Sequence, residues 1–372
     1  MSTMIPSKCL SPSPYSCGRG KLRLLQRAAV SRSTYNKLAG IAHPVGRRWN
    51  RRRGKVCSAS TEFEDFVQAV QEDICTEVAA FDGSGKSFIH DKWDRPAGGG
   101  FGITRVLQDG NLLEKAAANV SIVKGVLTPA RAQAMTSRGR IVDPEGGQEY
   151  SAAALSLVFH SASPMVPTFR ADVRCFQVEG GETWFGGGAD LTPYYLFDSD
   201  ASEFHGFWKK TCDGYDESLY PAYKTWCDEY FYIPARKEHR GVGGIFFDDL
   251  TNGGGPASEN GGDARVKCDD AQSFTQQVAS SLMPSYLPIA ERRRSMDYGE
   301  EQRRWQLLRR GRYLEFNLLY DRGVRFGLDG GRIESIMVSA PPLIAWEYNV
   351  VPEEGSPEAN LVAVLQKPKE WA

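Results

Sequence analysis

The stretch Trp184-Phe185-Gly186-Gly187-Gly188-Ala189-Asp190-Leu191-Thr192-Pro193 is the point around which the rest of the chain is organised. Its three consecutive glycines remove side chains, so that the backbone can approach a large flat ligand closely. We interpret residues 186–190 as a turn that presents the carboxylate of Asp190 and ends at Thr192-Pro193. The alternative is a turn without a ligand, which is the commoner role of a glycine run.

Just upstream, the segment Phe169-Arg170-Ala171-Asp172-Val173-Arg174-Cys175 alternates between apolar and charged residues. This period of two predicts a half-buried strand with Arg170, Asp172 and Arg174 on one face. Two cations and a carboxylate beside the glycine turn suit a ligand that carries several acid groups and some N–H donors. The alternative is that these charges form the solvated face of the strand.

The chain has 372 residues, 41% of them hydrophobic, which is enough to bury a sizeable core. It contains no run of 18 apolar residues, so we expect no membrane span. The first 61 residues contain 13 Lys or Arg and no acid, which leaves 46 acidic and 32 basic residues in the remainder. An acidic body argues against nucleic-acid binding, which needs clustered Lys and Arg.

The acid-free leader is rich in Arg and Ser, as organellar presequences are. We predict that residues 1–57 are a disordered transit peptide and exclude them from the fold. Val56-Cys57-Ser58-Ala59 resembles a plastid processing site, which favours a plastid, with the mitochondrion as second choice. The alternative is a disordered basic tail that binds anions.

The chain has eight cysteines and no C-x-x-C pair. Five of them lie scattered in the body, which fits buried thiols in a reducing compartment better than a disulfide framework. The five are Cys75, Cys175, Cys212, Cys227 and Cys268.

Helical and strand patterns segregate along the chain. Apolar spacing predicts helices at 63–78, 198–232, 271–283 and 286–308, and a last helix capped by Ser356. Strands are predicted at 153–159, 169–175, 241–250, 312–319 and 334–339. Because strands cluster instead of alternating with helices, we predict an α+β fold with a large, mainly antiparallel sheet flanked by helices on both faces. Residues 58–372 are predicted to form one domain.

Several motifs of this body resemble those of the oxygen-dependent coproporphyrinogen III oxidase family. The resemblance runs from about residue 62 to the end, and the combination of motifs is highly specific. The matching segments are Trp184–Pro193, Trp226-Cys227-Asp228-Glu229-Tyr230-Phe231-Tyr232, residues 240–250, Tyr286-Leu287-Pro288-Ile289, Arg309-Arg310-Gly311-Arg312-Tyr313, Asp321-Arg322-Gly323, residues 332–336 and Trp346-Glu347-Tyr348.

The resemblance implies a broad antiparallel sheet between helices and a homodimer. It implies the conversion of coproporphyrinogen III to protoporphyrinogen IX, in heme and chlorophyll biosynthesis. Two propionates become vinyl groups, each losing its carboxyl group as carbon dioxide, with O2 as co-substrate and no metal or organic cofactor. It also implies that Asp190 accepts hydrogen bonds from pyrrole N–H groups and holds positive charge that develops on the ring.

Further site residues follow from the same resemblance. Arginines suit propionates because they pair with carboxylates in a bidentate way. The positions that match substrate-contacting residues of the family are Ser156, Asp172, Val173, Arg174, Arg240, Gly330, Gly331 and Arg332.

The chain departs from the family pattern on the strand at 169–175. Arg170 stands where the family has a histidine that is usually assigned as proton donor, and Asp172 stands where it has asparagine. Arginine stays protonated and is a poor general acid. Of four histidines suggested as metal ligands in some members, only His160 and His205 match, so we predict no metal site.

Two hypotheses follow from these departures. The first is an active oxidase in which Asp190, the arginines and oxygen suffice. The second is a divergent paralogue that binds a tetrapyrrole, or dimerises with an active relative, with little or no turnover.

Overall fold

The computed structural model describes residues 59–137, 140–258, 264–328 and 331–372. The predicted transit peptide at 1–57 lies outside these residues. The described residues belong to one compact unit. No helix within them is both long and apolar enough to cross a membrane.

Seven strands of the described chain form one antiparallel sheet in the order β1-β2-β3-β4-β5-β6-β9. Neighbours in the sheet follow one another along the chain except at the last edge, where two helices intervene before β9. The strands are β1 (Ile89–Asp94), β2 (Gly100–Gln108), β3 (Leu113–Val126), β4 (Glu149–Ser161), β5 (Thr168–Val178), β6 (Thr183–Thr192) and β9 (Gly243–Leu250).

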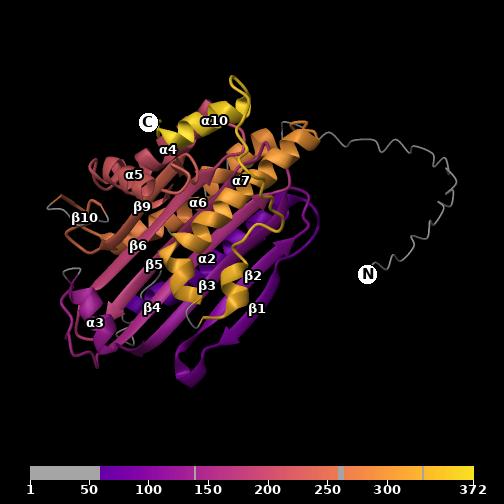
Figure 1. Ribbon diagram of the computed structural model, residues 1–372. Coiled ribbons are helices and arrows are strands. Elements are labelled where there is room, and N and C mark those ends of the chain that lie inside the picture. The colour runs from indigo at the N-terminus through magenta and orange to yellow at the C-terminus, as the bar shows by residue number, and fades with distance from the viewer. Residues whose placement is uncertain (1–58, 138–139, 259–263, 329–330) are drawn as a thin grey trace, which may run out of the picture. The chain divides into compact units, whose positions relative to one another are not determined.

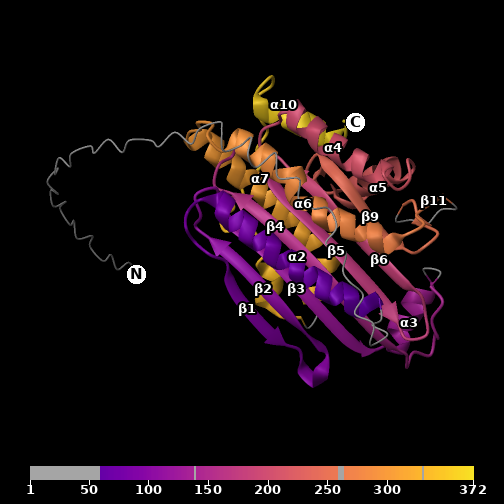
Figure 2. The ribbon, with the colours of Figure 1, turned by 180° about the vertical axis from the view of Figure 1, so that it is seen from behind.

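Helices cover both faces of the sheet (Figures 1 and 2). One face packs on α2 and α6, and α2 crosses it in the view of Figure 2. The opposite face meets α7 and the segment after α9, where Tyr313 and Val338 pack on Ala117 and Val158. The predicted α+β class is therefore confirmed. The helices are α2 (Ala59–Asp82), α3 (Pro129–Thr136), α4 (Asp198–Asp213), α5 (Leu219–Tyr230), α6 (Ala271–Arg293), α7 (Glu300–Leu319), α8 (Arg322–Leu328), α9 (Ile333–Met337) and α10 (Pro357–Gln366).

Smaller elements complete the chain. They are the 3-10 turn η1 (Pro96–Gly98) and the paired short strands β7 (Tyr232–Ile233) with β8 (Glu238–His239) and β10 (Gly255–Pro256) with β11 (Arg265–Val266). The last helix begins as predicted, because the Ser356 side chain accepts a hydrogen bond from the Ala359 N–H at 3.1 Å.

The side chains of β5 alternate between the two faces of the sheet, as the sequence pattern predicts. Phe169, Ala171, Val173 and Cys175 are at most 2% exposed and belong to the apolar core. The Phe169 ring stacks on Tyr286 of α6, with 4.9 Å between ring centres. The charged residues between them project to the other face. The five body cysteines are free and buried, as predicted.

Several predicted elements are wrong. The glycine run at 186–190 is not a turn but the middle of β6, paired with β5 and β9 along its length. The predicted strand at 312–319 lies inside α7, and the one at 334–339 overlaps α9. The predicted helix at 286–308 is the end of α6 and the start of α7, with a break at 294–299. For the glycine run and for α7, packing against neighbouring segments of the sheet decides the local structure.

Candidate active site

The register of β4, β5 and β6 brings five of the predicted site residues to one face of the sheet. Arg170 is opposite Asp190, and Asp172 lies between Ser156 and Gly188 in one row. Arg174, two residues further along β5, faces the same way. This is the face that α7 covers. Residues from separate strands thus form a single charged surface.

Asp190 is the buried centre of this surface. It is 3% exposed, and its Oδ1 accepts a hydrogen bond from Arg240 Nη2 at 2.6 Å. Burial raises the pKa of Asp190, and the positive charges of Arg240 and Arg170 oppose that shift. A carboxylate held by one cation keeps acceptor capacity for further N–H donors.

Arg240 reaches Asp190 from the segment between β8 and β9. Its guanidinium lies 3.9 Å from the centre of the Phe231 ring, and Nη1 donates to Asn317 Oδ1 at 3.3 Å. The residue is 2% exposed, and the ion pair with Asp190 compensates its buried charge. Removing either partner would leave the other charge buried and unpaired.

Arg170 lies beside Asp190 but has its own carboxylate partner. Its Nη2 is 3.8 Å from Asp321 Oδ2. Burial alone would lower the pKa of Arg170, but Tyr313, Asp321 and Asp172 raise it above its usual value. Arg170 is therefore a permanent cation, and nothing in its surroundings prepares it to donate a proton.

Arg174 and Asp172 pair with each other on the half-buried part of the surface. Arg174 also lies 3.3 Å from Asp248 of β9. These side chains explain Gly186, because a Cβ there would lie 2.7 Å from both Arg174 Nε and Asp248 Oδ1. Glycine inside β6 therefore makes room for charged groups of its neighbours.

The structure does not bring Arg332 to the same place. Arg332 pairs with Asp91 of β1 at 2.7 Å. Asp91 and Asp172 are separated by four strand spacings in one row of the sheet, which is about 19 Å. The neighbouring Gly331 is partly buried beside Arg332. Arg174 and Arg332 therefore lie at opposite ends of the charged surface.

Of the two other predicted site residues, one lies in the apolar core and one lies outside the described residues. The Val173 side chain packs in the apolar core, on the face opposite to Asp172. Gly330 lies outside the described residues.

Three residues that the sequence interpretation did not place in the site lie at its centre. Tyr313 and Asn317 come from α7, and Asp321 follows that helix and caps α8 through a 3.0 Å bond from the Val324 N–H. The spacing of the first two could have shown that they share one side of their element. Tyr313 and Asn317 are four residues apart, and residues at this spacing face the same way in a helix and in a strand.

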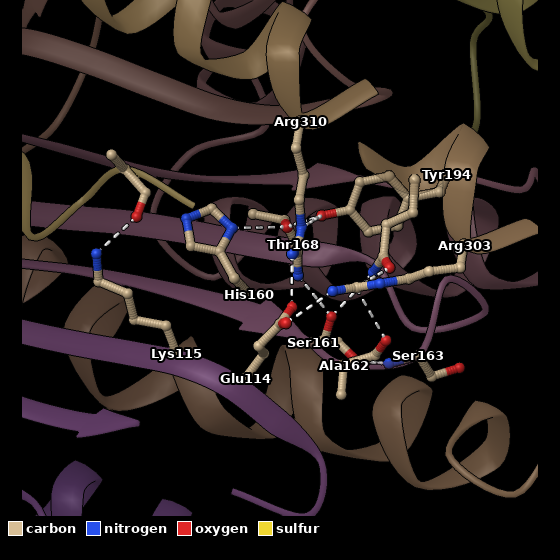
Figure 3. A network of polar contacts seen from close by, with 12 residues as sticks. Glu114, Lys115, His160, Ser161, Ala162, Ser163, Thr168, Tyr194, Arg303 and Arg310 are labelled. Atoms are coloured by element: carbon tan, nitrogen blue, oxygen red, sulfur yellow. Dashed lines mark hydrogen bonds and ion pairs between the residues drawn. The ribbon is translucent and has the colours of Figure 1, made fainter. Parts of the chain in front are cut away.

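His160 belongs to a buried network that ties α7 to the sheet (Figure 3). Its Nε2–H donates to the Ser339 carbonyl at 3.0 Å, so Nδ1 accepts from the Thr168 hydroxyl at 3.2 Å. Arg310 of α7 reaches the Ser161 carbonyl at 2.7 Å in the same network. Both ring nitrogens are occupied by protein groups.

His205 is held in the same way. Its Nε2–H donates to the Val242 carbonyl at 2.9 Å, and Nδ1 accepts from the Tyr220 hydroxyl at 3.0 Å. Within the described part of the chain, no three His, Cys, Asp or Glu side chains gather in a way that could hold a metal ion.

These two histidines predict a loss of stability in acid. Burial lowers the pKa of His160 well below its usual value and that of His205 to about 4. The unfolded chain takes up protons below about pH 6.5, whereas the folded chain resists them, so stability falls as the pH falls. His205 alone should lower the free energy of unfolding by about 2 kcal/mol between pH 7 and pH 5.

Urea unfolding at the two pH values measures this effect, with His205→Gln as the comparison. Other groups titrate in both proteins, so only the difference between their pH dependences belongs to His205. Equal pH dependence in the two proteins would contradict the assignment.

Fold and surface together define an α+β protein with a buried carboxylate among arginines, on a sheet face suited to a polyacidic ligand with N–H donors. The chain belongs to the coproporphyrinogen III oxidase family, whose sequence model matches residues 62–371.

Similar proteins of known name agree with this membership. The chain is 45% identical over 324 residues to coproporphyrinogen-III oxidase 1, chloroplastic, of Arabidopsis thaliana. The aligned region covers 84% of this chain and 80% of that protein. It is 44% identical over 314 residues to the oxygen-dependent coproporphyrinogen-III oxidase of Drosophila melanogaster, with 83% and 77% covered. The chloroplastic oxygen-dependent enzyme of Glycine max is 45% identical over 324 residues, with 84% and 80% covered.

Proposed function

We propose that the protein is an oxygen-dependent coproporphyrinogen III oxidase that produces protoporphyrinogen IX. Its family supports this function, and so do the names of relatives from a plant and an insect. The structural observation that carries the proposal is the buried Asp190–Arg240 pair on the sheet face that also presents Arg174.

The reaction explains the types of residue on this surface. A porphyrinogen presents four pyrrole N–H groups near its centre and carboxylates at its rim. Asp190 would accept from the N–H groups and stabilise positive charge on a pyrrole as it is oxidised. Arg174 and Arg332 would hold propionates, since each is part-exposed and paired with a surface-facing carboxylate that a propionate can replace.

Electrons and atoms balance with O2 alone as oxidant. Each propionate loses carbon dioxide and two electrons, together with one proton from the side-chain carbon that is attached to the pyrrole ring. O2 takes up these electrons, this proton and a second proton from solvent, and leaves as hydrogen peroxide. We therefore propose that the protein uses O2 as co-substrate and needs no metal or organic cofactor.

The setting of the protein is part of the proposal. The chloroplastic relatives support a plastid location, with residues 1–57 as transit peptide and residues 58–372 as the mature domain. The family resemblance supports a homodimer. The alternative of a divergent paralogue without turnover gains no support from the comparisons.

A turnover assay tests the function directly. Residues 58–372 are supplied with coproporphyrinogen III and O2 under added chelator, and protoporphyrinogen IX is measured after oxidation to its fluorescent porphyrin. Product in the presence of chelator is the expected result. Tight substrate binding without product would instead support the divergent paralogue.

Restoring the family residues on β5 tests whether the departures impair catalysis. The double change Arg170→His with Asp172→Asn removes one positive and one negative charge, so the net charge of the surface is kept. We expect turnover to stay within about tenfold of the native value. Arg170 is an ion-pair partner of Asp321, and the native site is proposed to work without a general acid at this position.

A restored general acid is typically worth about a hundredfold or more. A rise of that size in the double variant would show that the native chain lacks a group that it needs. Arg170→His alone serves as control, because it leaves Asp172 in place.

A further inference from the structure

Three buried hydrogen-bond donors lie around the Asp190–Arg240 pair. They are the Tyr313 hydroxyl, Asn317 Nδ2 and Arg240 Nε, and none has a hydrogen-bond partner among the described residues. Each of the three residues is 2% exposed, so bulk water does not satisfy them. Buried donors in folded proteins nearly always have an acceptor, and a group of three without one indicates a ligand.

The contacts of these residues place the donors together. Asn317 Oδ1 accepts from Arg240 Nη1 at 3.3 Å, which leaves the amide Nδ2 free to donate. The Arg240 guanidinium lies 5.0 Å from the centre of the Tyr313 ring. Tyr313 and Asn317 are one turn apart on α7, and the Asn317 side chain lies close enough to the Tyr313 hydroxyl to lower its pKa, although the pair does not reach hydrogen-bond geometry.

The charge around the donors favours an anion. Burial raises the pKa of Tyr313 overall and the charge of Asp190 adds to that shift, while Arg170 and Arg240 oppose it and favour negative charge beside the hydroxyl. The hydroxyl therefore remains protonated at neutral pH and can donate. Arg170 is a permanent cation and cannot serve as an acid, whereas Tyr313 and Asn317 offer neutral donors at this site.

The apolar walls favour a small ligand. Phe231 and Phe316 lie against the Arg240 guanidinium, with 3.9 and 4.9 Å to their ring centres. Apolar rings beside the donors suit neutral O2 better than a carboxylate, and the donors and the guanidinium stabilise the oxygen once it carries negative charge. Propionates have better partners in Arg174 and Arg332, which are part-exposed at the rim of the surface.

We propose that Tyr313, Asn317 and Arg240 form the site where O2 is reduced, and that their donors bind the oxygen anion as it forms beside Asp190. This inference rests on the proposed function. O2 accepts two electrons and one proton from the propionate chain that becomes a vinyl group, carbon dioxide leaves, and a proton from solvent completes hydrogen peroxide. Tyr313 and Asn317 donate hydrogen bonds to the reduced oxygen and are unchanged at the end.

Two isosteric changes in the full chain test the site. Tyr313→Phe removes the hydroxyl, and Asn317→Asp keeps the acceptor for Arg240 but replaces the donor by a charged acceptor. Turnover is measured with an oxygen electrode over a range of O2 concentrations, and coproporphyrinogen III binding is measured without O2. We expect kcat/KM for O2 to fall roughly ten- to a hundredfold in each variant, with substrate binding unchanged.

Tyr223→Phe is the matched control. The Tyr223 hydroxyl is also buried and without a partner among the described residues, but its ring stacks on Phe247 in the apolar core. We expect native dependence on O2 in this variant. An equal loss of kcat/KM for O2 in Tyr223→Phe would overturn the proposal, because the effect would then be one of packing.

The remaining outcomes also decide the matter. Weaker anaerobic substrate binding with unchanged dependence on O2 would assign the donors to a propionate and overturn the proposal. Unchanged kinetics in both site variants, with an active native chain, would overturn this site alone. A native chain without turnover would overturn the proposed function and this site with it.

Discussion

Asp190→Asn should lower turnover of coproporphyrinogen III by about a thousandfold, as the loss of a group that stabilises transition-state charge does. The amide keeps the shape of the side chain and an acceptor for Arg240, but it loses the negative charge that faces the pyrroles. The change also leaves the buried Arg240 without a counter-ion, which should cost roughly 3 kcal/mol of stability. Single-turnover rates, measured on protein shown to be folded, separate the two effects.

Asp200→Asn is the matched control for this prediction. Asp200 is 4% exposed and pairs with Arg292 and Arg293, so it resembles Asp190 in burial and in its partners. It joins α4 to α6, away from the charged surface. Its variant should lose stability and keep its turnover per folded molecule. Turnover of Asp190→Asn within about tenfold of native would rule out the role proposed for that carboxylate.

Gly188→Ala should lower the free energy of unfolding by about 3 kcal/mol, at the upper end of what forcing one extra carbon into a packed site costs. A Cβ at this position would lie 2.4 Å from the backbone oxygen of Ile245 in β9. Backbone cannot rotate away as a side chain can, so β6 and β9 must separate locally. Chemical unfolding of the variant and the native protein measures the loss.

The same substitution in α4 should have the opposite sign. Gly206 lies inside the helix, and a Cβ there would meet nothing within 4 Å. Gly206→Ala should therefore stabilise the protein by roughly 0.5–1 kcal/mol, the difference in helix propensity between the two residues. If both glycine variants changed stability alike, close approach of β9 would not explain Gly188.

The face of β5 could be predicted because it depends on neighbours in the chain. Alternation along 169–175 requires that Arg170, Asp172 and Arg174 share one side, whatever the strand packs against. The pattern at 312–319 is ambiguous by comparison. Tyr313 and Asn317 fit a strand by alternation and a helix by their spacing of four, and packing of α7 on the sheet selects the helix.

The glycines of β6 are a second case in which the local sequence does not determine the secondary structure. A run of three glycines is compatible with a turn, and in isolation it lacks side chains that would stabilise a strand. In the folded protein β5 and β9 hydrogen-bond to both sides of this segment, and neighbouring groups occupy the space that side chains would need. The strand therefore forms because of its partners and not because of its own residues.

Sequence alone was enough for the family, the α+β class, the alternating faces of β5 and the types of residue that the chemistry requires, since these depend on residue identity and short-range periodicity. Tertiary structure decided which charges meet. Arg170 pairs with Asp321, Arg240 with Asp190 and Arg332 with Asp91, and all these partners are distant along the chain. Ion pairing and desolvation depend on distances in space, so the burial of Asp190 and the unpaired donors of Tyr313 and Asn317 appear only once the chain is folded.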